Sequence, residues 1–371
     1  MKPLRIRIVG GSLAGLFAGV LFQRGGHDVR IYERSRHGLG GRGAGLVAQQ
    51  EVFQMLRLIG CEHVASIGVV ARERIYLERN GVVAQTLATP QTQVSWDVLY
   101  EAVASHIASG HYVLSRTVER VSDGPNGATI RFSDGTSEEA DLVIGADGVG
   151  SVVRRAVNPD NYTNSFAGYA AWRGLIPETA LPEGAGLLLE RFAFYVAQGV
   201  HVLGYLVPGP RGEMAKGERR YNWVWYRKVP AGELAGLFTD RSGKRFEFSL
   251  PRGGLSDDRR DGLRRDAFDV LPPQFALAVA AEDAPSIQGI FDYEAPRMVG
   301  GSIALIGDAA FVVRPHTAMG VSKAAGDVLA LQRHIAAGSE LRPALAHYES
   351  ERRPIGEEIA AYGRRLGASA L

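Results

Sequence analysis

The sequence predicts an α/β protein in which a Rossmann-like nucleotide-binding domain is interleaved with a β-sheet domain and followed by C-terminal helices. Three observations predict this fold class. A hydrophobic strand at residues 5–9 runs into a glycine-rich turn and an apolar helix. Two later apolar strands, at 141–145 and 303–306, each lead into a turn that contains glycine and aspartate. Residues 168–227, between them, have the turns and alternation that are typical of a sheet.

The first of these segments has the sequence of a nucleotide-binding βαβ unit. Its turn covers residues 10–15, its helix continues to Arg24, and a second strand ends at Glu33, which lies 23 residues after Gly10 (33 − 10). Glycines permit a tight turn, the helix N-terminus offers amides to a pyrophosphate, and an acid at this spacing can accept hydrogen bonds from ribose hydroxyls. Ser12 replaces the middle glycine, and a small residue is tolerable there. The alternative is a packed glycine turn that binds nothing.

The two later segments each deliver an acid at the end of a buried strand. In the first, Asp147 and Gly148 follow the strand, and we expect a helix whose first turn carries Ser151. In the second, Gly307 and Asp308 follow the strand, then residues 315–320, then a helix that starts near Ser322. Either segment alone could be an ordinary strand-to-helix connection.

Together the three segments resemble the signatures of the class A flavoprotein aromatic hydroxylases, the para-hydroxybenzoate hydroxylase superfamily, from Arg5 to about Arg353. The resemblance implies that the first unit binds the ADP half of FAD. It also implies that the second segment lies near the FAD and NAD(P)H pyrophosphates and that the third holds the ribityl chain and FAD pyrophosphate, while Arg154 matches the arginine after the second turn. The implied FAD-binding residues are Gly10, Ser12, Leu13, Ala14, Gly15, Glu33, Arg34, Arg42, Asp147, Gly148, Gly307, Asp308, Pro315, Ala318, Met319 and Gly320.

Shorter phrases are similar to the 2,6-dihydroxypyridine 3-hydroxylase group within this superfamily. They are residues 41–45, 172–174, 201–209 and 314–318. Two departures from the wider superfamily also fit the group. Ala318 stands where many members have glycine, and Trp96 stands where many have an arginine before the interdomain helix.

Composition and charge agree with a flavoenzyme. At 371 residues and 46% hydrophobic content, the chain is long enough for two domains. The net charge of +2 gives no argument for nucleic acid, and the mixed Asp257–Asp266 run indicates a solvated helix face. Cys61 is the only cysteine, which excludes an intramolecular disulfide and a C-x-x-C redox pair. No secretory signal or membrane-spanning run is visible, so we expect a cytoplasmic enzyme without a membrane partner.

The two predicted domains are discontinuous in sequence. We assign 1–70, 97–166 and 297–371 to the FAD-binding domain and 71–96 and 167–296 to the substrate domain. The expected elements are a helix at 52–58, a hairpin at 74–87 that turns at Asn80-Gly81, and a helix at 96–108. Hairpins at 123–124 and 134–135, helices within 258–281 and C-terminal amphipathic helices follow.

The chemistry expected of the chain follows from the resemblance. NAD(P)H would reduce FAD, oxygen would add to the flavin C4a, and the hydroperoxide would deliver an oxygen atom to an electron-rich ring. The sequence contains no convincing metal-ligand spacing and no Ser/His/Asp arrangement. A ring hydroxyl activates the ring when it is deprotonated, so we expect a proton acceptor or relay at the site.

Three residues are candidates for catalysis. Tyr205 alternates with His201 on one strand face and is the first candidate for the relay, with a tyrosine simply packed in the sheet as the alternative. His316, in the loop that borders the flavin in this family, is the second, and a hydrogen-bonded loop histidine is its alternative. Arg42 is expected to reach the flavin or an anionic substrate, with an ordinary surface arginine as the alternative.

These inferences favour a monooxygenase that hydroxylates a hydroxypyridine-like ring. The alternatives are a hydroxylase of a phenol, a flavin dehydrogenase or epoxidase of a non-aromatic substrate, and a flavin-binding module without turnover. The sequence leaves open which ring and carbon react, whether NADH or NADPH is the reductant, and the oligomeric state, a homodimer included.

Overall fold

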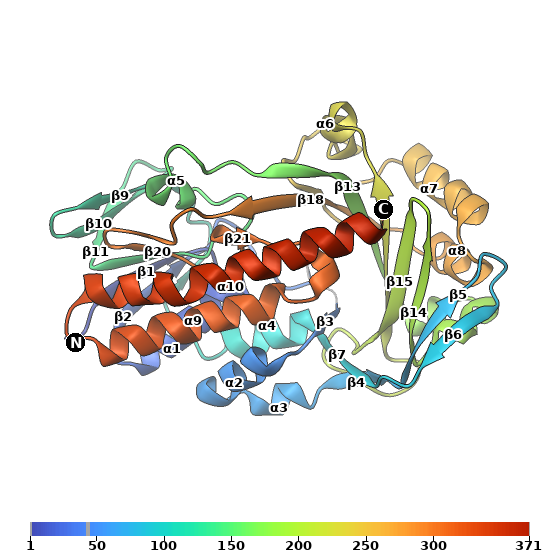
Figure 1. Cartoon of the computed structure of the whole chain (residues 1–371), viewed down its shortest axis with the longest axis horizontal. Helices are drawn as coiled ribbons and strands as arrows, with labels where there is room; N and C mark the ends of the chain where they lie inside the picture. Colours follow the sequence, from blue (N-terminus) through green and yellow to red (C-terminus); the bar gives the residue numbers. More distant parts are fainter. Residues whose placement is uncertain (1, 42–44, 371) are drawn as a thin grey trace.

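A six-stranded sheet forms the centre of one body of the molecule (Figure 1). The computed structural model describes residues 2–41 and 45–370. The strand order is β19-β20-β12-β1-β2-β8, and all pairs are parallel except β19 with β20. The strands are β1 (Arg5–Val9), β2 (Asp28–Tyr32), β8 (Tyr112–Val113), β12 (Leu142–Gly145), β19 (Val299–Gly300) and β20 (Ile303–Leu305).

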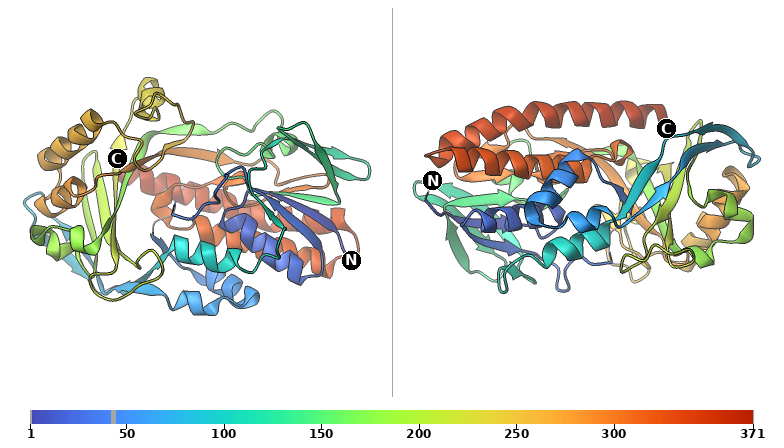
Figure 2. Two further views of the ribbon diagram at one scale, coloured as in Figure 1. Left: turned by 180° about the vertical axis from the view of Figure 1, so that it is seen from behind. Right: turned by 90° about the horizontal axis from the view of Figure 1, so that it is seen from below.

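Helices cover one face of this sheet and a small sheet covers the other. α1 (Leu13–Arg24) connects β1 to β2, because parallel neighbours need a crossover, and it packs against α9 (Gly320–Ala337). The long α10 (Leu341–Ala370) lies on α9 and runs towards the second body (Figures 1 and 2). The antiparallel strands β9 (Val118–Gly124), β10 (Gly127–Phe132) and β11 (Ser137–Ala140) form the small sheet.

A second, larger sheet forms the other body. Its order is β17-β18-β13-β16-β15-β14-β5-β6, with β21 paired to β18. Helices α7 (Asp257–Val270) and α8 (Pro273–Ala280) cover the face that points away from the first body (Figure 1). The strands are β5 (Glu73–Leu77), β6 (Val83–Leu87), β13 (Ser165–Pro177), β14 (Arg191–Ala197), β15 (Val200–Val207), β16 (Arg220–Lys228), β17 (Ser249–Leu250), β18 (Ser286–Glu294) and β21 (Phe311–Val312).

The two bodies meet at a three-stranded sheet and several short helices. Strand β7 (Gln91–Ser95) pairs with β3 (Gly45–Val47) and β4 (Gly68–Ala71), so this sheet crosses the domain division that we predict at residues 70–71. The remaining helices are α2 (Gln50–Ile59), α3 (Glu62–Ala65), α4 (Trp96–Ala104), α5 (Arg154–Val157), α6 (Leu234–Leu237), η1 (Glu178–Ala180), η2 (Glu183–Leu188), η3 (Ala231–Glu233), η4 (Gly307–Ala309) and η5 (Pro315–Thr317).

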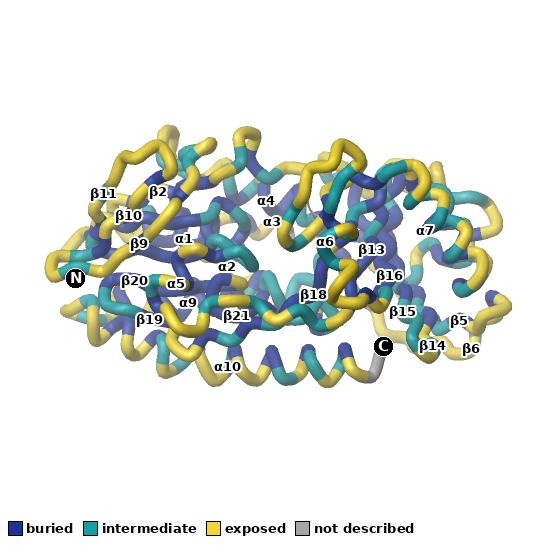
Figure 3. Tube along the Cα trace, turned by 90° about the horizontal axis from the view of Figure 1, so that it is seen from above, coloured by how far each residue is buried: buried dark blue, intermediate teal, exposed yellow. Residues whose placement is uncertain are grey.

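Buried residues line the sheets in both bodies, and exposed residues lie on the outer turns and helix faces (Figure 3). No helix in the described part of the chain is both long enough and apolar enough to span a membrane. The single cysteine, Cys61, is buried and has a free thiol.

The predicted fold class is confirmed, and three local predictions are wrong. The helix expected to reach residue 108 ends at Ala104, where the Ser105 hydroxyl donates to the Ala102 carbonyl and competes with helix continuation. The first hairpin turns after Gly124 rather than at it. Helix α5 has only four residues, and Ser151 lies before it because its hydroxyl donates to Asp147.

Candidate active site

The turn between β1 and α1 forms a cradle that only glycine can build. Gly10 has φ +103°, and a Cβ atom there would lie 2.4 Å from the Ala146 carbonyl oxygen. A Cβ at Gly15 would lie 1.9 Å from the Gly10 oxygen. Ser12 caps α1 without a side-chain hydrogen bond, and the first helix amide to bond back to it belongs to Leu16. The amides that precede Leu16 in the helix can therefore donate to an external anion.

Glu33 lies behind this turn. Its buried carboxylate accepts hydrogen bonds from the Gly11 amide at 2.9 Å and the Ser35 amide at 2.7 Å. The acid thus fixes the shape of the turn. Because a carboxylate oxygen can accept more than one bond, contact with a ribose stays a prediction, as does any role for the exposed Arg34.

Aromatic residues from distant parts of the chain close the same turn. The Tyr112 hydroxyl donates to the Gly11 carbonyl at 2.9 Å and lies 2.9 Å from the Tyr100 hydroxyl. Trp96 stacks on Tyr100 with 5.0 Å between ring centroids. Neither tyrosine was predictable as part of the site from the sequence, because only the fold brings them to the turn.

A buried ion pair holds the second turn, at Gly307 and Asp308. The Lys323 ammonium donates to the Gly307 carbonyl at 2.7 Å, and the Asp327 carboxylate accepts from the Gly307 amide at 3.0 Å. Gly307 has φ +57°, which favours glycine. The Asp308 side chain is exposed and makes no hydrogen bond to any residue that the structure describes. It is therefore available to ligand hydroxyl groups.

Arg154 ties the remaining turn to this one. Its fully buried guanidinium donates to the carbonyls of Asp308 at 2.7 Å and Ala309 at 2.9 Å, and it lies 3.7 Å from the centroid of the Tyr293 ring. Burial lowers the pKa of this arginine. Arg154 thus acts on the site by positioning the Asp308 turn.

Asp147 shapes its own turn. Its carboxylate accepts from the Ser151 hydroxyl at 2.6 Å and the Val152 amide at 2.7 Å. Gly148 follows with φ +74°. Their contact with a flavin stays a prediction.

The donor set of these turns fits FAD. A glycine cradle with amides at a helix N-terminus suits a pyrophosphate, and an unpaired carboxylate at Asp308 suits the hydroxyls of a ribityl chain. Within residues 2–41 and 45–370 there is no group of three or more His, Cys, Asp or Glu side chains that could hold a metal ion.

The second half of the site is one face of the large sheet, which we call the inner face. The antiparallel register places His201 opposite Tyr226 and Tyr205 opposite Asn222, so alternate residues share the face. Contacts with His316 and Gly45 show that it faces the first body. Its residues include Tyr169, Ala171, Arg173, His201, Leu203, Tyr205, Asn222, Val224 and Tyr226.

His316 reaches the inner face from the loop after β21. Its Nε2 lies 3.0 Å from the Tyr169 hydroxyl, and its ring lies 5.4 Å from His201 and 4.2 Å from Tyr226 between centroids. Burial lowers the pKa of His316 to about 3 and that of His201 to about 4. Nδ1 of His316 and both ring nitrogens of His201 are buried without a partner among the described residues. Both imidazoles are therefore neutral and have unused hydrogen-bonding capacity.

Of the other catalytic candidates, Tyr205 lies on the inner face and Arg42 lies outside the described residues. The Tyr205 hydroxyl donates to the Gly45 carbonyl at 3.2 Å, and burial raises its pKa. Pro315 begins η5 just before His316, and Met319 and Gly320 form the N-cap and the first residue of α9; their contact with FAD stays a prediction.

Sequence reasoning missed two polar residues on this face. Asn222 is fully buried, and neither atom of its amide has a partner in the described part of the chain. Arg173 donates to Gln288 at 3.0 Å, but its buried Nε is unpaired. Strand alternation with Tyr205 and Tyr226 was the available signal, but it needed the register between strands.

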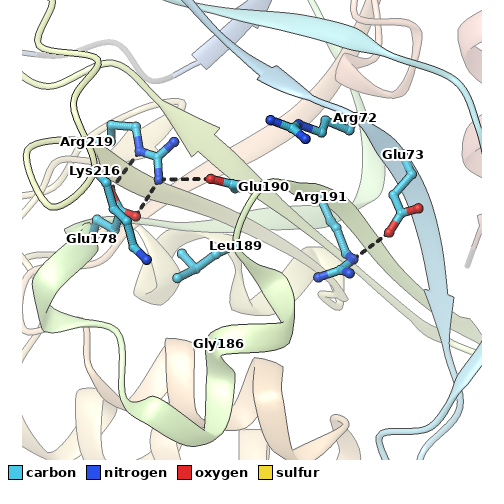
Figure 4. Close-up of a pocket in the computed structure, with 9 residues that line it drawn as sticks. All are labelled: Arg72, Glu73, Glu178, Gly186, Leu189, Glu190, Arg191, Lys216 and Arg219. Carbon is cyan, nitrogen blue, oxygen red and sulfur yellow. Dashed lines mark hydrogen bonds and ion pairs between the residues drawn. The ribbon is translucent and has the colours of Figure 1, made fainter.

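A separate pocket of about 460 Å³ lies by β5 and β14 and is lined by Arg72, Glu73, Glu178, Gly186, Leu189, Glu190, Arg191, Lys216 and Arg219 (Figure 4). Its charges largely pair with one another: Arg219 holds Glu178 at 2.6 Å and Arg191 holds Glu73 at 2.7 Å. Arg191 points to the face opposite that of Phe192, so this pocket is not part of the inner face.

Comparisons with known proteins agree with this geometry. A model of an FAD binding domain family matches residues 4–182 and 276–362, and a model described as FAD binding domain-like matches 166–292. The chain is 32% identical to the 2,6-dihydroxypyridine 3-monooxygenase of Paenarthrobacter nicotinovorans, over 93% of this chain and 86% of that protein. It is 30% identical to the 3-amino-4-hydroxybenzoate 2-monooxygenase of Streptomyces cremeus, over 98% and 87%. The structure of 2,6-dihydroxypyridine-3-hydroxylase from Arthrobacter nicotinovorans superposes with a TM-score of 0.93 at 29% identity, over 100% of this chain and 93% of that one.

Proposed function

We propose that the substrate of this protein is a hydroxylated N-heteroaromatic ring of the hydroxypyridine type. The premise is that the chain belongs to the FAD-binding class A flavoprotein hydroxylases and is an FAD-dependent aromatic monooxygenase. One observation carries the proposal. The inner face combines aromatic side chains with neutral imidazoles that have unpaired nitrogens, at His201 and His316. Such a surface can stack a flat ring and hydrogen-bond its substituents.

FAD, when bound, would supply the redox chemistry in which NAD(P)H provides two electrons, one atom of O2 is transferred to the ring and the other leaves as water. The chain's own part is to hold the cofactor and to prepare the ring. In this proposal the amides at the start of α1 donate to the pyrophosphate, and the Asp308 carboxylate accepts from ribityl hydroxyls. A cytoplasmic location fits the reductant and the free thiol of Cys61.

The first group on the route of the proton from the ring hydroxyl is an imidazole of the inner face. A neutral imidazole with an unpaired nitrogen accepts the hydrogen bond of the ring hydroxyl, and because its lowered pKa does not hold the proton, His316 passes the proton on through its contact with the Tyr169 hydroxyl. Tyr205 is the weaker acceptor because its raised pKa keeps the hydroxyl protonated and its proton is directed at Gly45.

Single substitutions separate these roles. His316→Gln keeps a polar side chain and removes the proton relay, so we expect a loss of at least about tenfold in kcat with FAD still bound. Tyr205→Phe should have a smaller effect. The turnover rate of each variant is measured from the absorbance change with the substrate that the wild-type protein hydroxylates. A normal rate in the His316 variant with a slowed Tyr205 variant would reverse the assignment.

A phenolic substrate is the second candidate. The similarity to a protein named 3-amino-4-hydroxybenzoate 2-monooxygenase favours it, because that name specifies a hydroxylated benzene ring.

The deciding experiment compares 2,6-dihydroxypyridine with its carbocyclic counterpart resorcinol. NADH and NADPH oxidation by the FAD-loaded protein is followed with each ring, and product masses are read from the same reactions. We expect the pyridine to stimulate oxidation and to gain one oxygen atom. Oxygen gain by resorcinol alone would establish the phenolic alternative, and stimulation without an oxygenated product would contradict hydroxylation of that ring.

A further inference from the structure

The inner face contains a positive charge whose opposite charge is missing. Arg173 projects from β13 beside Val224 of β16, in the row next to the Ala171–Tyr226 pair. Its hydrogen bond at 3.0 Å goes to Gln288, a neutral amide, and its buried Nε has no partner among the residues described. A guanidinium normally uses its planar set of donors on carboxylates or other anions.

Two other arginines around this face are paired with carboxylates. Arg220 pairs with Asp97 at 3.3 Å, and Arg314 pairs with Asp292 at 2.6 Å. Arg74, on β5, donates to Gln91 at 3.0 Å, lies 5.7 Å from the centroid of the Phe192 ring and also has a buried Nε without a partner among the described residues. Lys228, at the end of β16, is exposed. Arg173 and Arg74 thus both have unused donors, and Arg173 is the one whose charge acts on Tyr205 and Tyr226.

The two histidines do not add charge next to it. Their pKa values of about 4 and 3 leave His201 and His316 neutral at neutral pH. Arg173 also lies close enough to Tyr205 and Tyr226 to act on their hydroxyls, since its charge opposes the rise that burial produces in the pKa of each. A ring resting on this face near Tyr205 and Tyr226 thus meets the positive charge of Arg173.

We propose that Arg173 is the counter-ion for a deprotonated ring hydroxyl, so that the enzyme binds its aromatic substrate as the anion. The inference rests on the proposed aromatic hydroxylase function and names the ionisation state that the site selects. The proton leaves the ring oxygen for solvent, relayed by an imidazole of the face, and the oxyanion accepts charge-assisted hydrogen bonds from the guanidinium. An anionic oxygen on the ring donates electron density to the carbon that is hydroxylated. Arg173 thereby contributes both to binding and to activation of the ring.

The ionisation of the bound ring tests this proposal without turnover. FAD-loaded protein is titrated with 2,6-dihydroxypyridine and with resorcinol in the absence of NAD(P)H, and difference absorbance reports the ring pKa in the complex. We expect the wild-type protein to lower that pKa by at least about one unit, a tenfold preference for the anion. Arg173→Gln, which keeps a polar side chain but removes the charge, should abolish the shift, and Arg173→Lys should retain part of it.

Two matched variants complete the design. Arg227→Gln removes a charge from the opposite face of β16, where Arg227 pairs with Asp266, and should leave the ring pKa unchanged. Arg74→Gln removes the rival cation. Thermal melting and flavin content of each variant verify that it folds and holds FAD.

The outcomes separate the two proposals. An unchanged pKa shift in Arg173→Gln, or loss of the shift only in Arg74→Gln, would overturn the role of Arg173 whatever the ring. If resorcinol alone binds and is hydroxylated, the N-heteroaromatic proposal fails, and Arg173 is judged from the resorcinol titration. If wild-type protein binds neither ring, the ring proposal and the role of Arg173 fail together.

Discussion

At the scale of single residues, the two neutral histidines make the folded state sensitive to acid. In the unfolded chain a histidine has a pKa of about 6.5, whereas in the fold the values are about 4 for His201 and about 3 for His316. As the pH falls below about 6.5, the unfolded state binds protons that the folded state refuses, so stability is lost. Above that pH the contribution is fully present.

We expect the free energy of unfolding to fall between pH 6.5 and 4, by up to about 3 kcal/mol for each imidazole. Urea denaturation across this range measures the slope. His201→Phe should flatten it, whereas His63→Gln, at an exposed position on α3, should not. Equal slopes for wild type and His201→Phe would mean that His201 titrates normally in the fold.

Ala318 has a strained backbone conformation that should lower the stability of the protein. It has φ +54° and ψ +19°, a left-handed conformation that is costly for any residue with a Cβ atom. We expect Ala318→Gly to raise the free energy of unfolding by roughly 0.5–1 kcal/mol, since relief of strain exceeds the added chain entropy. Ala336→Gly, within helix α9, should instead destabilise by about 1 kcal/mol. A destabilised Ala318 variant would show that the loop is not strained.

At the scale of elements, helix α9 supports the turn at Gly307 and Asp308 through its buried ion pair. Lys323 donates to the Gly307 carbonyl, and Asp327 accepts from the Gly307 amide. Arg352 of α10 donates to the other Asp327 oxygen at 2.8 Å. We predict that Lys323→Met weakens FAD binding by about tenfold or more and destabilises the protein by about 2–4 kcal/mol. Flavin fluorescence titration gives the dissociation constant, with the exposed Lys244→Met as control. Unaltered FAD affinity would show that the turn holds its shape without the lysine.

Features of the site that lie within one local unit were predictable from the sequence, and those that join distant segments were not. The cradle at Gly10 and the position of Glu33 were predictable, because both lie within one βαβ unit whose spacing is set by its helix. The supports contributed by Tyr112, Lys323 and Arg154 were not, because each joins segments that are far apart in sequence. Ser151 was misplaced for a related reason: a side-chain bond to Asp147 replaces the helix turn expected there.

At the scale of the whole molecule, the interleaved fold class was predictable because three strand-to-turn segments recur along the chain with a sheet-like region between them. The composition of the inner face was not. It depends on the register of β13, β15 and β16, which aligns Arg173, Tyr205 and Asn222 with the loop of His316. A shift of one residue in any of these strands would turn those side chains to the face covered by α7 and α8.

The two bodies are joined by more than the chain that runs between them. Strand β21 returns from the six-stranded body to pair with β18, and Arg314 pairs with Asp292 at 2.6 Å. An ion pair between Arg364 of α10 and Glu294 adds a further link.

Because of these contacts we expect FAD, which binds the first body, to stabilise both bodies. At a free concentration 100 times its dissociation constant it should add about 2.7 kcal/mol, and its removal should lower the melting temperature by several degrees. Calorimetry should show one transition that moves as a unit. Two transitions of which only one responds to FAD would mean that these contacts do not couple the bodies.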